Sequence, residues 1–412
     1  MTPRLAAIVV LLGISIVINY IDRGSLSTAA SLVQTEFSLS QSQLGFLLTA
    51  FFITYIPMQP FVGWLIDRFS ASRVLMAGFL VWSLATALGG ISQGFAGLFA
   101  CRLLLGVGES VSFPTLAKIF AENVPESQRG LANAVTQAGL SLGPAFGIFL
   151  GGNLIAHWGW RPFFIVVGLA SFTWAAAWAA VAHGHVRQTN ARYDPNAPAF
   201  GLILREPSLW GASLGHFFAN YYLYFLVTWL PYYLVHQRHW SLTQMASIGG
   251  ATFLLAGISV IACGAISDRL IRRGADSTLV RKTAFAIGAI GGGAGLIACG
   301  YSSGTASEAW LLVAGFLGGC LGANTYVVAQ VKAGPAATGR WVGIQNTLAN
   351  LAGLIAPSLT GILIEKTGTF AIAFAIAGAT AFCSGAAWIF LTGRYERIDW
   401  TTRRLALSPV PL

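Results

Sequence analysis

The sequence predicts an all-α membrane protein with twelve transmembrane helices, and three observations lead to this fold class. Of the 412 residues, 55% are hydrophobic and 9% are charged, and the mean hydropathy is +0.68. Such a chain cannot close into a water-soluble globule. Apolar runs of about 20 residues, the length that a membrane-spanning helix needs, recur along the whole chain with short polar turns between them.

Each predicted helix is one of these apolar runs. Outer-membrane strands are excluded, because the runs are about twice as long as a tilted strand needs and do not alternate between polar and apolar residues. Helices satisfy their own backbone hydrogen bonds, which lipid requires. In chain order, the predicted spans are residues 5–26, 41–66, 73–93, 95–120, 130–154, 161–183, 207–235, 243–267, 280–300, 308–332, 339–363 and 369–392.

The first run, residues 5–18, resembles the core of a signal peptide, but it continues into NYIDR without a small-residue cleavage site. We therefore expect it to begin the first helix. The longest polar stretch separates the sixth run from the seventh. It divides the chain into an N-terminal six-helix bundle at 1–183, a cytoplasmic linker at 184–206, a C-terminal six-helix bundle at 207–392 and a cytoplasmic tail at 393–412.

The net charge of +10 follows from the predicted topology. With both termini in the cytoplasm, 19 of the 24 Lys and Arg residues fall on cytoplasmic segments. Three lie outside (Arg161, Arg238 and Lys366), and two lie within helices. This is the positive-inside distribution, and it explains the basic composition without a nucleic-acid partner. We expect a multi-pass protein of the cell inner membrane, in contact with the lipid bilayer.

Neither a cofactor nor a metal is expected. The five cysteines lie in or beside hydrophobic runs without paired spacing. Glycine-rich stretches such as GVG at 106–108 lie inside hydrophobic spans, where glycine favours close helix packing and not phosphate binding. Because no catalytic motif is present either, an enzyme is not expected. Among the six histidines, His216 is the exception that lies within a helix, and it is a candidate for binding.

An internal repeat supports the division into two halves. GWLIDRFSASR at 63–73 matches GAISDRLIRRG at 264–274 in Gly, Asp and Arg, and ANAVTQAGLSLGP ending at Pro144 resembles QNTLANLAGLIAP ending at Pro357. Parallel duplication of six-helix halves is typical of transporters, whose two bundles rock around a site near the membrane midplane. The sequence therefore indicates alternating access.

The loop at 63–73 resembles the signature G-x-L-x-D-R-x-G-x-[RK] of the major facilitator superfamily, with Ser70 in place of the second glycine. The resemblance implies the major facilitator fold of two pseudo-symmetric bundles. The acidic and basic residues of the loop can pair with the neighbouring bundle in one conformation and separate in the other. Asp67 and Arg68, with their repeat copies Asp268 and Arg269, are therefore predicted to form a cytoplasmic gate, or else to be topological anchors.

Three further motifs are similar to the anion:cation symporter family within that superfamily. They are NYIDRGSLSTA at 19–29, R-x-x-x-G-x-x-E-S at 102–110 and Q-N-T-x-x-N-x-A-G-x-x-A-P at 345–357. The resemblance implies a proton symporter for a small organic anion, a sugar acid such as an aldonate, aldarate or hexuronate, or else an aromatic carboxylate. An anion exchanger or efflux carrier of the same fold and a solute sensor are the alternatives. No dimerisation surface is readable, and a monomer is expected.

Four ionisable residues sit in runs otherwise apolar enough to span a bilayer: Asp22, Arg23, Arg102 and Glu109. Each costs about 2.5 to 3.5 kcal/mol at the bilayer centre on insertion scales, so we expect them to pair and to serve a task. Arg23 is predicted to face the cavity and bind the substrate carboxylate through its planar donor fork. Asp22 is predicted to turn toward Arg102 and Glu109, and these three are expected to couple proton binding to conformation.

The alternative is an ion network that only fixes helix packing, although apolar residues would pack there at lower cost. The remaining candidates for substrate binding carry amides or phenols that could hold the hydroxyls of a sugar acid, or could instead bond between helices. Besides Arg23, these predicted substrate-binding residues are Tyr20, Tyr55, Gln137, Asn220, Asn346 and Asn350. Asn324 and Gln330 are weaker candidates.

Overall fold

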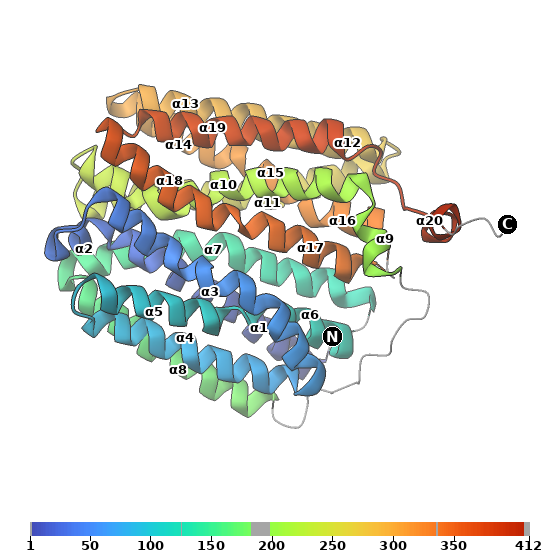
Figure 1. Cartoon of the computed structure of the whole chain (residues 1–412), viewed down its shortest axis with the longest axis horizontal. Coiled ribbons are helices and arrows are strands. Elements are labelled where there is room, and N and C mark those ends of the chain that lie inside the picture. The colour runs from blue at the N-terminus through green and yellow to red at the C-terminus, as the bar shows by residue number, and fades with distance from the viewer. Residues whose placement is uncertain (1, 125, 183–197, 335–336, 408–412) are drawn as a thin grey trace. The chain divides into compact units, whose positions relative to one another are not determined.

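The computed structural model describes residues 2–124, 126–182, 198–334 and 337–407, and this part of the chain is helical with short turns (Figure 1). Its helices are α1 (Pro3–Thr28), α2 (Ala30–Phe37), α3 (Gln41–Arg68), α4 (Ala71–Ile91), α5 (Gly94–Glu109), α6 (Ser112–Asn123), α7 (Glu126–Trp158), α8 (Trp160–Ala182), α9 (Phe200–Leu204), α10 (Pro207–His236), α11 (Leu242–Arg272), α12 (Ser277–Ile287), α13 (Gly293–Tyr301), α14 (Gly304–Gly318), α15 (Cys320–Ala323), α16 (Thr325–Ala333), α17 (Thr338–Asn350), α18 (Ala352–Thr367), α19 (Ala371–Ala386) and α20 (Trp400–Leu407). Two π-helical segments, Gly288–Gly292 and Ala387–Leu391, join or extend them.

The all-α membrane fold is confirmed. In the described residues, ten single helices or series of consecutive helices are long and apolar enough to cross a membrane. The helices α7 and α10, with 33 and 30 residues, are of comparable length and coincide with the fifth and seventh predicted spans. Together they give the twelve long helices that the apolar runs predict, with bounds that differ by a few residues.

Three short helices were not predicted, because they lack a long apolar run. The helix α2 follows α1, α9 precedes α10, and α20 lies beyond the last span. Residues 184–197 of the predicted linker lie outside the described residues, and the described remainder contains α9. The fourth predicted span is also interrupted: α5 ends at Glu109 and α6 begins at Ser112.

By its internal contacts the chain forms two compact units. Unit 1 comprises Met1–Ala191, Tyr224–Leu254 and Gly353–Ala373, and unit 2 comprises Arg192–Leu223, Leu255–Ala352 and Phe374–Leu412. Several long helices therefore contribute to both units, and the predicted division at the linker stays a prediction. The positions of the predicted site residues can be described within each unit.

Glycines bring α5 close to its neighbours in unit 1. A Cβ atom on Gly106 would lie 2.2 Å from the carbonyl oxygen of Phe51 on α3, and one on Gly108 would lie 2.6 Å from the backbone nitrogen of Trp82 on α4. No side chain fits at these distances, so glycine lets the helix backbones touch. The prediction that this glycine-rich stretch serves helix packing is confirmed, and this packing fixes the position of α5, the helix that carries Arg102 and Glu109.

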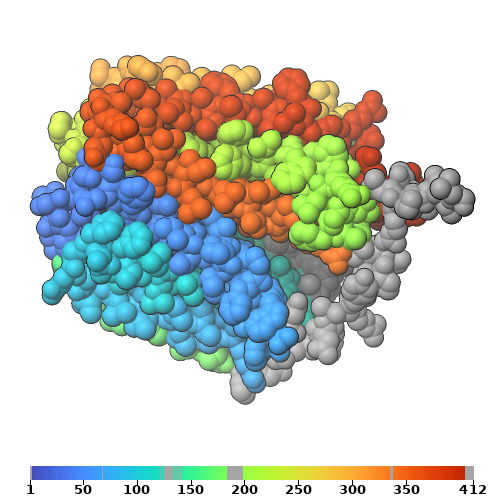
Figure 2. Space-filling model, in the orientation of Figure 1, coloured from blue at the N-terminus to red at the C-terminus, as the bar shows by residue number. Residues whose placement is uncertain are grey.

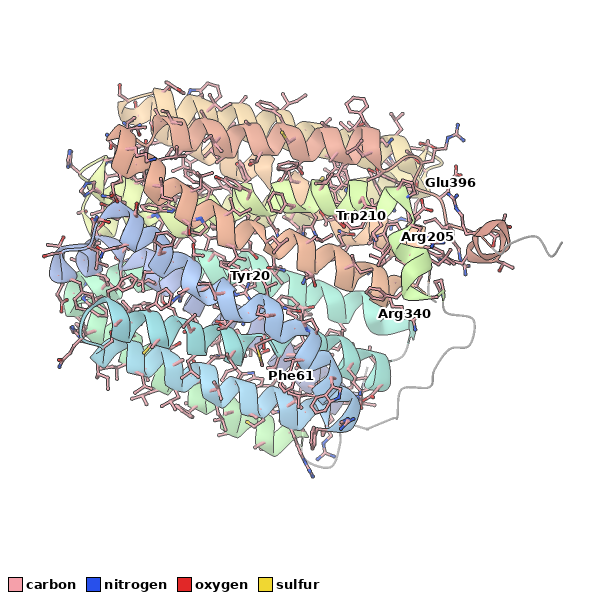
Figure 3. All side chains as sticks on the ribbon, in the orientation of Figure 1. Tyr20, Phe61, Arg205, Trp210, Arg340 and Glu396 are labelled. Atoms are coloured by element: carbon pink, nitrogen blue, oxygen red, sulfur yellow. The ribbon has the colours of Figure 1, made fainter. Side chains whose placement is uncertain are left out.

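Unit 2 has an aromatic core at one end, built on Trp341, Trp388, Phe285 and Tyr395. The rings of Phe285 and Trp388 stack with centroids 4.5 Å apart. Figure 2 shows α9 (green) directly against α17 (orange), and Ile203 of α9 is part of this core. Arg205, Trp210, Arg340 and Glu396 all lie at the same end of unit 2 (Figure 3).

The residues after the last span belong to this core. The side chain of Lys332 donates hydrogen bonds to the carbonyl oxygens of Thr392 and Arg394, at 2.9 and 2.8 Å. The phenol of Tyr395 donates to the carbonyl of Trp388 at 2.8 Å, and the indole of Trp400 donates to that of Ala333 at 2.8 Å. The segment from Thr392 to Trp400 is therefore a packed part of unit 2.

Candidate functional site

All four membrane-embedded charges are buried inside unit 1. Asp22 and Arg23 lie on α1 and are 0% and 6% exposed, while Arg102 and Glu109 lie on α5 and are 4% and 0% exposed. We call them the charged cluster, together with Asn19 of α1 and Thr86 of α4, which hydrogen-bond at its edges. Burial at this level removes charges from water, so each must find a partner or become neutral.

Arg23 and Glu109 form the ion pair of this cluster. The Nε atom of Arg23 donates to Oε2 of Glu109 at 2.8 Å. The guanidinium also lies over three aromatic rings, those of Tyr20, Phe51 and Tyr55, at 4.8, 4.7 and 4.6 Å from the centroids. Tyr20 is labelled in Figure 3. These rings stabilise the cation by cation–π interaction and keep its planar group in one orientation.

This pairing differs from the predicted arrangement, in which Asp22 turns toward Glu109. Adjacent residues on a helix diverge by about 100°, so Asp22 and Arg23 face different neighbours. The carboxylate of Asp22 accepts a hydrogen bond from the hydroxyl of Thr86 at 3.1 Å. Arg102 reaches α1 as predicted, but its Nη1 donates to the backbone carbonyl of Asp22, at 3.3 Å, and not to the carboxylate.

The charged cluster contains several buried polar atoms that have no hydrogen-bond partner among the described residues. They are Oδ1 of Asn19, Oδ2 of Asp22, Nη2 of Arg23, Nε of Arg102 and Oε1 of Glu109. Buried polar groups normally form hydrogen bonds, and each exception costs about 1 to 3 kcal/mol. Among the described residues, each carboxylate thus has one oxygen without a hydrogen bond, and each guanidinium has at least one such nitrogen. Such a cluster offers acceptor atoms for protons and donor atoms for an anion.

Sequence reasoning missed Asn19, Ser112 and Thr86. The amide of Asn19 donates to the hydroxyl of Ser112 at 3.3 Å. Asn19 opens the first-helix motif and Ser112 follows the fourth-helix motif by two residues, so the motifs offered a signal for both. Thr86 offered none, because a single threonine in an apolar span is common in helix packing.

A second polar group within unit 1 joins α10 and α18 to the helices of the first half. The phenol of Tyr232 on α10 donates to Oε1 of Gln34 at 2.5 Å and accepts from Nε2 of Gln41 at 2.7 Å. The backbone nitrogen of Ser42 donates to Glu365 of α18 at 2.7 Å. Gln34 and Gln41 flank the loop between α2 and α3, so several contacts hold these helix ends together.

A neutral polar group lies in unit 2, and we call it the neutral cluster. Its members come from α10, α16 and α17: His216, Tyr326, Trp341, Gln345, Asn346 and Asn350. The phenol of Tyr326 donates to Oδ1 of Asn346 at 3.1 Å. Two of the predicted binding residues, Asn346 and Asn350, are therefore linked here, the second through its amide to the backbone carbonyl of the first, at 2.8 Å.

The other predicted residues lie in different surroundings. Tyr55 is 1% exposed and stacks on Phe51 with centroids 4.9 Å apart. Asn220 is half-buried on α10. The side chains of Gln137 and Asp67 lie outside the described residues, although their backbones belong to α7 and α3. The weaker candidate Asn324 donates to the hydroxyl of Ser267 at 3.4 Å, within unit 2.

The remaining gate candidates are exposed. Arg68 lies with its guanidinium 4.5 Å from the ring centroid of Trp64, another exposed residue. Asp268 and Arg269 are exposed near the end of α11. The side chain of Lys118 donates to the carbonyl of Ile66, one residue before Asp67. The gate role of these residues stays a prediction.

The cysteines and acidic residues provide no metal site in the described part of the chain. All five cysteines are free thiols, and no group of three His, Cys, Asp or Glu side chains converges there.

Known proteins resemble this chain over most of its length. A model of the Major Facilitator Superfamily matches residues 12–357. The hexuronate transporter of Bacillus subtilis is 31% identical over 382 residues, which cover 89% of each chain. The probable galactarate/D-glucarate transporter GarP of Escherichia coli is 29% identical over 414 residues, which cover 93% of each chain. The probable sulfoacetate transporter SauU of Cupriavidus necator is 29% identical over 400 residues, 91% of this chain and 90% of that one.

A solved structure shows the same fold. It is a bacterial homolog of the human lysosomal transporter Spinster in an inward-facing, unoccupied conformation, with a TM-score of 0.75, 18% identity and 98% coverage of both chains. The helical fold and these relatives define a polytopic membrane transporter. The chain belongs to the Major Facilitator Superfamily. The predictions of that family, and of a transporter in place of an enzyme, are confirmed by these relatives.

Proposed function

We propose that this chain imports a small organic anion, most simply a sugar acid such as an aldarate or hexuronate, together with protons by alternating access. The observation that carries this proposal is the buried pair of Arg23 and Glu109, 2.8 Å apart, with one unpartnered atom on each side. The relatives support the substrate class, because their names specify galactarate, glucarate, hexuronate and sulfoacetate transport. All of these are anions.

The pair can bind a substrate anion and a proton together. A guanidinium binds a carboxylate with two parallel hydrogen bonds, and Arg23 uses only Nε for Glu109. When a substrate carboxylate binds Arg23, the positive charge of Arg23 is shared between the substrate and Glu109. Because Glu109 is buried away from water, its neutral, protonated form is then favoured. Protonation of Glu109 therefore accompanies anion binding. This linkage makes the proton and the anion move in the same direction.

Asp22 and Arg102 give the cluster a second proton site. One carboxylate oxygen of Asp22 accepts a hydrogen bond from Thr86, and the other has no partner among the described residues. Arg102 donates to the backbone carbonyl of Asp22. A small rotation of α1 or α5 would let the Arg102 guanidinium take the carboxylate instead. Release of the proton from Asp22 would then favour that conformation, as the predicted coupling role of these residues requires.

The remaining predicted roles belong to this proposal. Tyr20, Tyr55, Gln137, Asn220, Asn346 and Asn350 would contribute to the substrate cavity, and Asp67, Arg68, Asp268 and Arg269 to a cytoplasmic gate. We place the protein in the cell inner membrane with both termini in the cytoplasm, because the positive-inside distribution requires that orientation. We propose that a monomer is the transporting unit.

Proteoliposomes with a trapped pH dye test the function. Aldonates, aldarates, hexuronates and aromatic carboxylates are added outside in turn, and internal acidification is recorded. We expect acidification with one class of sugar acid, and none in liposomes that contain the Glu109→Gln variant. Uptake of a labelled anion without acidification, dependent on an internal counter-anion, would instead establish an exchanger. Acidification with aromatic carboxylates alone would reassign the substrate.

A further inference from the structure

One member of the neutral cluster, Trp341, has a side-chain nitrogen that can act only as a hydrogen-bond donor. The indole Nε1 of Trp341 can only donate, and it donates to Oε1 of Gln345 at 3.1 Å. Both side chains are fully buried, at 0% exposure. The oxygen of the Gln345 amide is therefore committed to Trp341, and its NH₂ group points the opposite way.

That NH₂ group fixes the protonation state of His216. Nε2 of Gln345 lies 3.3 Å from Nδ1 of His216. Because the amide nitrogen can only donate, Nδ1 must accept, so it carries no proton. The imidazole is then neutral, with its proton on Nε2. Protonating Nδ1 would bring two donors face to face, and no hydrogen bond from a charged side chain of the described residues compensates the cation.

The imidazole is also held in position by an aromatic contact. The ring of His216 meets the ring of Tyr326 edge to face, with centroids 5.4 Å apart and planes at 87°. Tyr326 donates to Oδ1 of Asn346, so the NH₂ group of that amide remains as a donor. His216 is 7% exposed, and Asn346 is half-buried. The neutral cluster therefore presents two donors without a charge.

We infer that His216 is a substrate-binding residue, held as a neutral Nε2–H donor by Trp341 through Gln345, and that together with the Asn346 amide it recognises uncharged oxygens, such as sugar hydroxyls. The inference rests on the proposed sugar-acid transport and deepens it. Trp341 and Gln345 are positioning residues in this scheme. It also excludes His216 from proton coupling, which the charged cluster performs.

The test compares two aldarates in reconstituted full-length protein. D-glucarate and galactarate differ in the configuration of one hydroxyl, so a hydroxyl-binding residue affects them unequally. In the His216→Phe variant we expect the KM of the better substrate to rise about three- to tenfold, the loss of one neutral hydrogen bond. The number of protons per substrate and the pH profile should stay those of the wild type. The matched control is His157→Phe, an exposed histidine on α7, which should leave all these values unchanged.

The Gln345→Glu variant tests the fixed proton. A carboxylate cannot donate to Nδ1, so His216 can take a second proton, and transport should gain a pH dependence that the additional change His216→Phe removes. If Gln345→Glu does not fold, Trp341→Phe replaces it, and the KM should then rise unequally for the two aldarates, as in His216→Phe. An unchanged KM in His216→Phe, equal effects on both aldarates, or a changed proton count would overturn the inference.

A binding measurement distinguishes failure of this inference from failure of the proposed function. The thermal shift of detergent-solubilised protein by D-glucarate and by galactarate needs no proton movement. If the wild type shows this shift but never acidifies liposomes, symport fails while the His216 comparison remains measurable. If neither aldarate shifts or is transported by the wild type, the hexuronates D-galacturonate and D-glucuronate, which differ at one hydroxyl too, serve as the probe pair. Failure of all four anions would overturn both proposals.

Discussion

The charged cluster of unit 1 and the neutral cluster of unit 2 are both buried, but they use their hydrogen-bonding groups differently. In the charged cluster, five polar atoms have no hydrogen-bond partner within the described part of the chain. In the neutral cluster, two series of hydrogen bonds hold the side chains, one from Trp341 through Gln345 to His216 and one from Tyr326 to Asn346. A cluster with unpartnered charges can change its partners, whereas uncharged side chains that hydrogen-bond to one another hold their geometry.

The difference assigns two tasks. Moving protons and anions requires groups whose partners exchange, and charged groups respond strongly to a change of one proton. Distinguishing one hydroxyl arrangement from another requires donors in fixed positions, because a misplaced polar group loses its hydrogen bond. We therefore expect variants of the charged cluster to alter coupling and pH dependence, and variants of the neutral cluster to alter substrate preference.

The largest expected effect is that of Glu109→Gln. The amide keeps the shape and can still accept from Arg23, but it cannot take a proton. Proton-driven accumulation should fall to background, while exchange of labelled for unlabelled substrate stays measurable, because exchange needs no net proton cycle. Counterflow and acidification assays on the same liposomes measure both. The matched control is Glu396→Gln, whose side chain is 71% exposed. Equal loss of exchange and accumulation would remove Glu109 from coupling.

Arg23→Ala separates substrate binding from stability. Alone, it leaves the fully buried Glu109 without its cation, which costs about 3 to 5 kcal/mol. The double variant with Glu109→Gln should recover most of the lost thermal stability. Its substrate affinity should nevertheless remain about ten- to a hundredfold below that of Glu109→Gln alone, as for a lost charged hydrogen bond. Normal affinity in the double variant would remove Arg23 from the substrate site.

Tyr326→Phe tests the neutral cluster in the same comparison. The change removes the hydroxyl that donates to Asn346 at 3.1 Å. We expect a loss of about 0.5 to 1.5 kcal/mol in binding free energy, the value of one neutral hydrogen bond. The loss should be the same at about pH 6 and about pH 8, because no member of this cluster changes charge there. Affinities measured at both pH values check this, and a pH-dependent loss would contradict the assigned neutrality.

The smallest effect is expected at an ion pair in contact with water. Glu36 on α2, outside the predicted and observed spans, accepts from Arg161 at 2.7 Å, with both side chains partly exposed, at 42% and 32%. The hydrogen bond from Arg161 lowers the pKa of Glu36 below its ordinary value of 4.5. The contribution of this ion pair to stability is therefore complete above pH 4.5, and it is lost as the pH falls through the lowered pKa of Glu36.

We expect Glu36→Gln to cost at most about 1 kcal/mol at neutral pH and nothing in strong acid. Thermal unfolding of the two proteins over this pH range measures the difference. Full stability of the variant at neutral pH would agree with a pair that solvent screens, whereas a large loss there would contradict the contrast between exposed and buried ion pairs.

The sequence predicted the spans well, and it predicted the burial of Asp22, Arg23, Arg102 and Glu109, but not that of Lys332. Hydropathy reports the length of an apolar run, and the predicted span 41–66 accordingly falls within α3 (Gln41–Arg68). It did not predict that Glu109 pairs with Arg23, because that choice depends on the rotation of α1 against α5. Nor did it predict α2 or α20, whose short sequences carry no long apolar run. The link from Trp341 to His216 joins residues more than a hundred positions apart, and no motif contains both.

The packed segment after the last span has a consequence for the order of events during synthesis. The final carbonyl groups of a membrane helix need partners, and here that of Trp388 is taken by Tyr395 while that of Thr392 is taken by Lys332. Tyr395 and Trp400 leave the ribosome after the whole last helix. Unit 2 therefore completes its fold only when translation has passed residue 400, so a chain released before that point would present unfinished helix ends to quality-control proteases.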